Sequence, residues 1–156
     1  MRNINIFFTK LTIPQFIFVM TVLSFLLPAL PSITLGGLNE NPIEKSSIAS
    51  QIINGSIVYP LLETIIYQPF LFWALRRNFF LKENDYLIIL VSASIFGISH
   101  NFGIAYILYT MLLGLIFSYT YWIYEESDKK LFIFKRSFWI VFSIHSLHNL
   151  LTLCLK

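Results

Sequence analysis

Tyr59-Pro-Leu-Leu-Glu-Thr-Ile-Ile-Tyr-Gln68 is an apolar run with one carboxylate near its middle. Glu63 is the only formally charged residue between Ser46 and Leu75. A lone carboxylate in hydrocarbon costs about 2.5–3.5 kcal/mol on insertion scales. Two arrangements offset this cost: a protonated side chain with a purely structural role, or a polar site shared with other helices. Two further apolar runs carry histidines, so we expect the chain to be built around Glu63.

The composition indicates an integral membrane protein. Of the 156 residues, 56% are hydrophobic and 12% are charged, whereas a soluble domain is about 25% charged. The net charge of +3 is therefore no sign of a nucleic-acid partner, and the expected environment is a lipid bilayer. The single cysteine, Cys154, excludes an internal disulfide. Residues 1–156 are expected to form a single membrane domain.

The apolar runs predict an all-α fold, a polytopic transmembrane helical bundle of about five spans, since a membrane helix needs about 20 apolar residues. No Asp, Glu, Lys or Arg occurs from Tyr86 to Tyr124. That run is too long for one helix at about 1.5 Å per residue, so we expect a break near Asn101-Phe102-Gly103. Gly114 should allow a close approach between helices. The predicted spans are Leu11–Leu30, Ser56–Leu75, Tyr86–His100, Ile104–Ile123 and Ser137–Leu155.

The segment 31–55 is expected to be an external loop with a short helix on the membrane surface. Asn41-Pro42-Ile43-Glu44 has the N-cap, the first-turn proline and the acid that are typical of a helix start. Pro60 and Pro69 are expected to kink the second span, because proline removes a backbone donor. A freed carbonyl in lipid is tolerated only against protein or water. This span should therefore lie inside the bundle.

The basic residues favour one orientation. Cytoplasmic loops carry an excess of Lys and Arg, so we expect a cytoplasmic N-terminus and a bacterial plasma membrane. In that orientation the two outer basic residues are Lys45 and Lys156, and the nine inner ones are Arg2, Lys10, Arg76, Arg77, Lys82, Lys129, Lys130, Lys135 and Arg136.

Three spans carry polar side chains at depths that allow them to meet. Glu63 lies in the second span and His100 at the end of the third. His145 and Asn149 lie four residues apart in the fifth and therefore share a helix face. We expect the acid and both imidazoles to line one cavity within reach of a shared water.

Three motifs in this order resemble the CAAX protease and bacteriocin-processing family, which consists of intramembrane glutamic endopeptidases related to the type II CAAX prenyl endopeptidases. The resemblance covers residues 59–151, which would be the catalytic region. The motifs are Pro60-x-x-Glu63-Thr64-x-x-Tyr67-Gln68, Phe96-x-x-x-His100 and His145-x-x-x-Asn149.

The resemblance implies a peptidase that activates water. Glu63 would be the general base, and His100 would bind and orient the water. His145 and Asn149 would donate hydrogen bonds to the oxyanion, each worth about 10²–10³-fold in rate. The implied substrate is a membrane peptide or a lipidated protein, and no cofactor is implied.

Two positions depart from the family's usual Glu-Glu-x-x-x-Arg motif. Thr64 stands where a second Glu is usual and Gln68 where Arg is usual. A buried ion pair replaced by a neutral pair can be close to neutral in energy, so the site can persist. We expect Thr64 and Gln68, together with Tyr67, Phe96 and His148, to bind substrate or to support the catalytic groups.

Other functions stay open at this point. A non-catalytic membrane protein on the same scaffold, such as a bacteriocin self-immunity factor or a chaperone-like partner, is favoured by the two departures. Glu63, His100 and His145 could bind zinc, and two membrane histidines could hold haem. A transporter has little support from one buried carboxylate and short inner loops.

Overall fold

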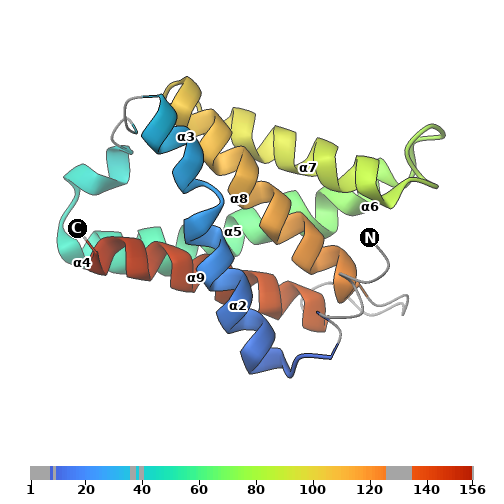
Figure 1. Ribbon diagram of the computed structural model, residues 1–156, viewed down its shortest axis with the longest axis horizontal. Coiled ribbons are helices and arrows are strands. Elements are labelled where there is room, and N and C mark those ends of the chain that lie inside the picture. Colours follow the sequence, from blue (N-terminus) through green and yellow to red (C-terminus); the bar gives the residue numbers. More distant parts are fainter. Residues whose placement is uncertain (1–7, 9, 36–37, 39–40, 126–134, 156) are drawn as a thin grey trace.

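A computed structural model describes residues 8, 10–35, 38, 41–125 and 135–155, and every regular element in these ranges is a helix (Figure 1). Four helices are long and apolar enough to cross a membrane: Ile13–Thr34, Ile48–Leu75, Ile104–Ile123 and Arg136–Cys154. A fifth apolar helix, α7 (Asp85–Ser99), has 15 residues and is about 22 Å long. The chain is thus an integral membrane protein with a helical bundle fold, as predicted.

The first span reaches beyond its predicted end at Leu30. It consists of α2 (Ile13–Leu26) and α3 (Ala29–Thr34), and Pro28 is the N-cap of α3. Pro31 lies in the first turn of α3. Proline is tolerated there because the first N–H groups of a helix have no intrahelical acceptor. These prolines therefore begin a second helix instead of ending the span.

The second span begins earlier than predicted, so the expected boundary near Ser56 is wrong. One continuous helix runs through Ile48–Leu75 and contains α4 (Ile48–Ser50), a π-helical segment η2 (Gln51–Val58), α5 (Tyr59–Ile65), a second π-helical segment η3 (Ile66–Phe70) and α6 (Leu71–Leu75). The Ser47 side chain caps its start by accepting a hydrogen bond from the Ser50 N–H. Of the expected surface helix, only the short 3₁₀ turn η1 (Pro42–Lys45) is a separate element.

Pro60 and Pro69 do not end this helix. Both are buried, Pro60 in the first turn of α5 and Pro69 inside η3. Carbonyl groups near both prolines accept hydrogen bonds from side chains of other helices. Gly55 and Ser56 accept from α9 (Arg136–Cys154), and Tyr67 accepts from Ser92 at 2.9 Å. These carbonyls thus meet protein, as expected, but only 28% of the apolar window of this span is buried, so the expectation that the span lies inside the bundle is only partly met.

α7 and α8 (Ile104–Ile123) form a tight hairpin. Gly103 has a φ of 107°, a conformation that favours glycine, and it lies in the predicted break. A Cβ on Gly97 would meet the Cβ of Met111 at 2.6 Å, and one on Gly114 would meet the Cα of Ala93 at 3.0 Å. The close approach predicted at Gly114 is confirmed, and Gly97 provides a second one.

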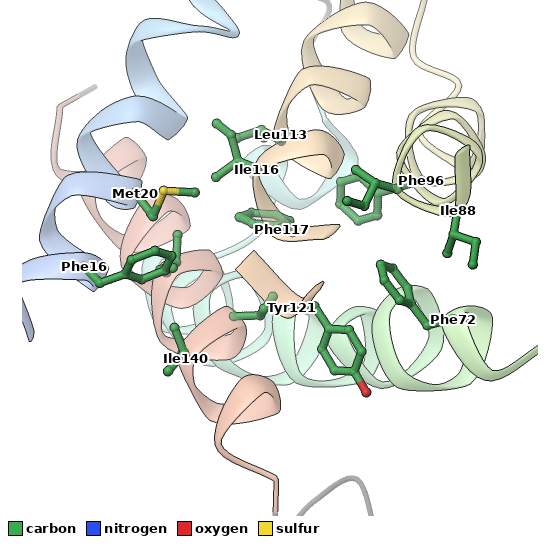
Figure 2. Close-up of a cluster of buried hydrophobic side chains, with 13 residues drawn as sticks. Phe16, Met20, Phe72, Ile88, Phe96, Leu113, Ile116, Phe117, Tyr121 and Ile140 are labelled. Atoms are coloured by element: carbon green, nitrogen blue, oxygen red, sulfur yellow. The ribbon is translucent and has the colours of Figure 1, made fainter. Parts of the chain in front are cut away.

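The core is formed mainly around α8 (Figure 2). Phe117, which is fully buried, lies between side chains of α2 and of α7. The labelled core residues are Phe16, Met20, Phe72, Ile88, Phe96, Leu113, Ile116, Phe117, Tyr121 and Ile140.

An ion-pair cluster joins three helices at one end of the bundle. Arg76, at the end of α6, lies 2.8 Å from Asp85 of α7 and 2.6 Å from Glu125 after α8. Burial alone would lower the pKa of Arg76, but the hydrogen bonds and charges of Glu125 and Asp85 raise it above its ordinary value. The guanidinium therefore stays charged at every pH at which the protein is folded.

Candidate active site

A cavity of about 370 Å³ opens beside Glu63. Its walls come from η1, η2, α5, α7, α8 and α9, and it combines apolar side chains with a few polar groups, as ligand pockets do. The lining residues are Leu38, Asn41, Ile43, Glu44, Gln51, Gly55, Ser56, Tyr59, Glu63, Phe96, His100, Tyr106, Tyr109, Thr110, Leu113, His145, His148, Asn149, Thr152 and Leu153.

The Glu63 carboxylate lies between two imidazoles in this cavity. Its Oε1 is 3.6 Å from Nε2 of His100 and its Oε2 is 3.5 Å from Nε2 of His145. The Glu63 side chain keeps 27% of its surface exposed, so the carboxylate faces the cavity, whereas His145 keeps only 5%. The structure thus brings together the acid and the two rings that the sequence analysis placed in one site.

His100 is held by the helix end that carries it. Its backbone N–H bonds to Gly97 instead of Phe96, and the Phe96 carbonyl accepts a hydrogen bond from the Ser99 hydroxyl and lies 2.7 Å from the ring Nδ1. A carbonyl only accepts, so Nδ1 carries a proton and donates it. In a neutral ring Nε2 is then an acceptor facing Glu63, and one proton can be shared between Nε2 and Oε1.

His145 presents a hydrogen-bond donor to Glu63, where His100 presents an acceptor. Its ring packs on Phe117 with centroids 4.5 Å apart and meets the edge of Phe96 at 6.0 Å. Within the described residues its buried Nδ1 has no hydrogen-bond partner. The proton of a neutral ring is best placed on Nε2, the nitrogen that faces Glu63. The carboxylate therefore meets an acceptor on one side and a donor on the other.

Asn149 lines the cavity, but one of its donors is in use. Its Nδ2 donates to the Gly55 carbonyl at 2.7 Å, and Ser146 donates to the Ser56 carbonyl next to it. In η2 the Tyr59 N–H donates to Asn54, five residues earlier, so residue 60 would donate to Gly55 if it were not proline. Asn149 thus replaces the hydrogen bond that Pro60 removes, and its oxyanion role stays a prediction.

The residues expected to support the site divide into two groups. Phe96 lines the cavity and packs against Tyr67 at 5.0 Å and against His100 at 4.5 Å. Tyr67, Thr64 and Gln68 do not line the cavity. Thr64 and Gln68 are each 1% exposed, and Gln68 accepts a hydrogen bond from Ser118 at 3.3 Å. Thr64 and Gln68 therefore lie behind the site, whereas Tyr67 is half-buried and reaches the site only through its contact with Phe96.

His148 belongs to a separate buried cluster that reaches the cavity. Its Nδ1 lies 2.9 Å from the Ser24 hydroxyl and its Nε2 3.0 Å from the Tyr109 hydroxyl. Phe25 stacks on the ring with centroids 4.5 Å apart. Ser24 and Tyr109 were not among the predicted site residues, although Tyr106, Tyr109, Thr110 and Leu113 show the spacing of one helix face.

The possible zinc site was tested against the arrangement of metal-ligating side chains. Within the described ranges, no group of three or more His, Cys, Asp or Glu side chains is placed to hold a metal ion. The two imidazoles approach different oxygens of Glu63, one from each side. This arrangement suits proton transfer at the carboxylate.

A comparison with protein families identifies a relative of the matched region. The family model described as Type II CAAX prenyl endopeptidase Rce1-like matches residues 45–151. Searches of curated proteins and of solved structures return no significant match. The matched region begins before Ile48, at the start of the second span, and includes Glu63, His100, His145 and Asn149.

Proposed function

The chain belongs to the Type II CAAX prenyl endopeptidase Rce1-like family, and on this premise we propose that it is an intramembrane glutamic endopeptidase. The family points to a membrane peptidase in general, and the chemistry is our own inference. The observation that carries it is the Glu63 carboxylate between Nε2 of His100 and Nε2 of His145, at 3.6 and 3.5 Å, in an accessible cavity.

In the proposed reaction Glu63 is the general base. It takes a proton from a water in the cavity while the water oxygen bonds to the scissile carbonyl carbon. The resulting tetrahedral intermediate carries its negative charge on the former carbonyl oxygen. Collapse of the intermediate breaks the C–N bond, and the proton held by Glu63 passes to the leaving amine nitrogen. The products are a carboxylic acid and an amine, as hydrolysis requires.

The histidines would have different tasks. The acceptor Nε2 of His100 can orient the second hydrogen of the water. The Nε2–H of His145 can hold the carboxylate before the reaction and donate to the oxyanion during it, with the remaining N–H of Asn149 as a second donor. Donors that are already in place stabilise the transition state most because nothing reorganises as the charge forms.

The proposal also covers the substrate, the metal requirement and the membrane in which the protein lies. The substrate would be a membrane peptide or a lipidated protein, and the reaction would need no metal. The protein would lie in a bacterial plasma membrane with its N-terminus in the cytoplasm, which a reporter fused to either terminus can test. Treatment with a zinc chelator should leave the activity unchanged.

The central experiment measures proteolysis by the purified protein in liposomes with a library of membrane-anchored peptides. Glu63→Gln removes the base but keeps the shape of the side chain, so cleavage should fall by at least about 10³-fold while the thermal midpoint changes little. Cys154→Ser, at an exposed position outside the cavity, is the matched control and should retain full activity. Cleavage that survives Glu63→Gln would contradict the mechanism.

A second function is favoured by one observation. Thr64 and Gln68 are neutral and fully buried where the family usually has an ion pair. A non-catalytic protein, such as a bacteriocin self-immunity factor or a chaperone-like partner, could keep this scaffold without the chemistry. If protection from a bacteriocin persists in Glu63→Ala cells and no peptide is cut, this second function replaces the first.

A further inference from the structure

Two tyrosines on the cavity face of α8 have no role in the mechanism above. Tyr106 and Tyr109 both line the cavity, and their ring centroids are 6.2 Å apart. Tyr106 also stacks near His100, with centroids 6.5 Å apart. The pair therefore begins beside the proposed catalytic groups and continues along the cavity wall.

The Tyr106 hydroxyl presents a donor to the cavity. Asn41 accepts a hydrogen bond from the Ile43 N–H through Oδ1 at 3.1 Å, which fixes the orientation of its amide. Its Nδ2 then donates to the Tyr106 oxygen at 3.0 Å. Since the oxygen accepts this bond, the hydroxyl hydrogen of Tyr106 is left to donate to another group.

The Tyr109 hydroxyl, in contrast, presents a hydrogen-bond acceptor to the cavity. Ser24 donates to the Thr21 carbonyl at 2.6 Å, so its oxygen must accept the proton on Nδ1 of His148, 2.9 Å away. His148 is 3% exposed, and a neutral ring avoids burying an unpaired charge. Its Nε2 is therefore an acceptor that takes the Tyr109 hydrogen at 3.0 Å. Only lone pairs of the Tyr109 oxygen remain for a ligand.

A donor and an acceptor side by side match a peptide backbone. Tyr106 and Tyr109 lie one helical turn apart on the cavity face of α8, and every second residue of an extended chain presents an N–H and a C=O on the same side. A helix cannot pair in this way because its N–H and C=O groups are already bonded within the helix. The match is to the backbone and leaves the side chains of the ligand free.

We propose that Tyr106 and Tyr109 form a subsite that binds the backbone of an extended, unwound peptide segment, Tyr106 donating to a carbonyl and Tyr109 accepting from an N–H. This rests on the proposed peptidase function and narrows its substrate class. The protein would act on membrane-anchored chains at segments that are not helical and would discriminate little between side chains there.

The test measures binding instead of cleavage, in the Glu63→Gln protein in nanodiscs. The probe is N-acetyl-trileucine methylamide, studied by titration calorimetry together with three analogues that each have one leucine N–H replaced by an ester oxygen. One hydrogen bond is worth about five- to tenfold in affinity. The ester analogue that lacks the N–H bound by Tyr109 should bind with an affinity lower by about that factor. Tyr109→Phe should lower the affinity for the all-amide probe by the same factor. The same variant should not lower the affinity for this ester analogue any further, because the hydrogen bond is already missing.

Two variants complete the design. Tyr106→Phe should weaken all four probes by a similar factor, and Tyr86→Phe, on the exposed N-terminal turn of α7, should weaken none. A helical peptide rich in α-aminoisobutyrate should not compete with the probe. Because Tyr109→Phe leaves His148 without its donor and can affect folding, the ester series on the unchanged Tyr109 protein is decisive by itself.

Several outcomes would overturn the subsite. These are the absence of probe binding, equal affinities for all four probes, additive effects of the ester and Tyr109→Phe, or equal competition by the helical peptide. Glu63-dependent cleavage together with any of these would reject the subsite and keep the peptidase. Tyrosine-dependent binding without any cleavage would reject the peptidase and keep the subsite.

Discussion

At the scale of single residues, the site depends on the length of one side chain. Glu63 reaches two Nε2 atoms at 3.5 and 3.6 Å from a helix that is distant in sequence from both histidines. Both contacts are already longer than an ordinary hydrogen bond, so a shorter acid cannot keep them. The geometry is thus sensitive to a change that leaves the charge intact.

Glu63→Asp tests this sensitivity. Removing one methylene withdraws the carboxylate by more than 1 Å, and a misplacement of this size can lower the rate by about 10²-fold. We expect kcat for peptide cleavage to fall by about that factor with little change in KM. Tyr59→Phe, at another cavity position, is the comparison and should keep most of kcat. A Glu63→Asp enzyme with full activity would contradict a directly acting base.

Glycine at residue 97 is required by packing. An added Cβ would lie 2.8 Å from the backbone oxygen of Ile107 and 2.6 Å from the Met111 Cβ, and neither atom can move without shifting α8. Gly97→Ala should therefore lower the stability by about 1–3 kcal/mol, measured by thermal unfolding in detergent. Gly55→Ala is the matched control, since its nearest neighbour would be the flexible Ile43 side chain at 3.5 Å. An equal loss in both variants would speak against the close helix contact.

At the scale of helices, α9 is joined to the second span by the groups that proline leaves unpaired. Ser146 and Asn149 are separated by one turn of α9, and they donate to the neighbouring carbonyls of Ser56 and Gly55. Backbone groups in lipid must be satisfied by protein or water. Because Pro60 has no N–H, the Gly55 carbonyl is available to accept from Asn149. This hydrogen bond fixes the position of α9 along the second span, beside Glu63.

A double-mutant cycle tests this pairing. Asn149→Leu should lower stability by about 1–3 kcal/mol because it leaves the Gly55 carbonyl unsatisfied. Pro60→Ala restores a backbone N–H for that carbonyl, so the loss caused by Asn149→Leu should be clearly smaller in its presence. Thermal unfolding in detergent gives the four values. Thr152→Val is the control on α9, because its hydroxyl bonds within its own helix to the His148 carbonyl. If the effects of Asn149→Leu and Pro60→Ala on stability simply add, Asn149 does not replace the hydrogen bond that Pro60 removes.

At the scale of the whole molecule, the cavity and the Arg76 ion-pair cluster lie at opposite ends of α7. The cavity lies where α7 turns into α8, and the Arg76 cluster lies where α6 and α8 end and α7 begins. Figure 1 shows the turn from α6 to α7 on the side of the molecule opposite the C-terminus and α4. The ion pairs thus hold three helices at the end away from the site.

Arg76→Gln should lower stability modestly, by about 1 kcal/mol, because the pairs are partly exposed and screened. The loss should shrink as salt rises, since the Debye length falls to about 3 Å at 1 M. Glu125 and Asp85 raise the pKa of Arg76 above its ordinary value, so its contribution is complete below the ordinary pKa and is lost only as the pH rises through the raised one. Lys82→Gln, whose exposed partner Glu83 is 4.0 Å away, should have almost no effect. A salt-independent loss at Arg76 would point to packing instead.

The elements of the fold followed from local signals in the sequence. The charge-free runs and the Asn101-Phe102-Gly103 break predicted α7, α8 and α9 to within one or two residues, because hydrocarbon excludes charged side chains and glycine permits the turn. The boundaries near Pro28, Pro31 and Ser56 were wrong, because proline is compatible with a first helical turn and a polar helix start can continue into a membrane span. Whether Asn149 faces a substrate or a carbonyl of another helix cannot be read from its spacing.

The amino-acid pattern was enough to predict a helical membrane bundle and to group Glu63 with His100 and His145, since a charge in hydrocarbon requires partners. The packed helices were needed to show which nitrogen of each histidine meets the carboxylate, that Asn149 compensates for Pro60, and that Tyr106 and Tyr109 present opposite hydrogen-bonding groups. These depend on contacts between residues far apart in the chain, such as Ser24 with His148 and Asn41 with Tyr106. Hydrogen-bond direction is set by the partner, and the partner is known only once the helices are packed.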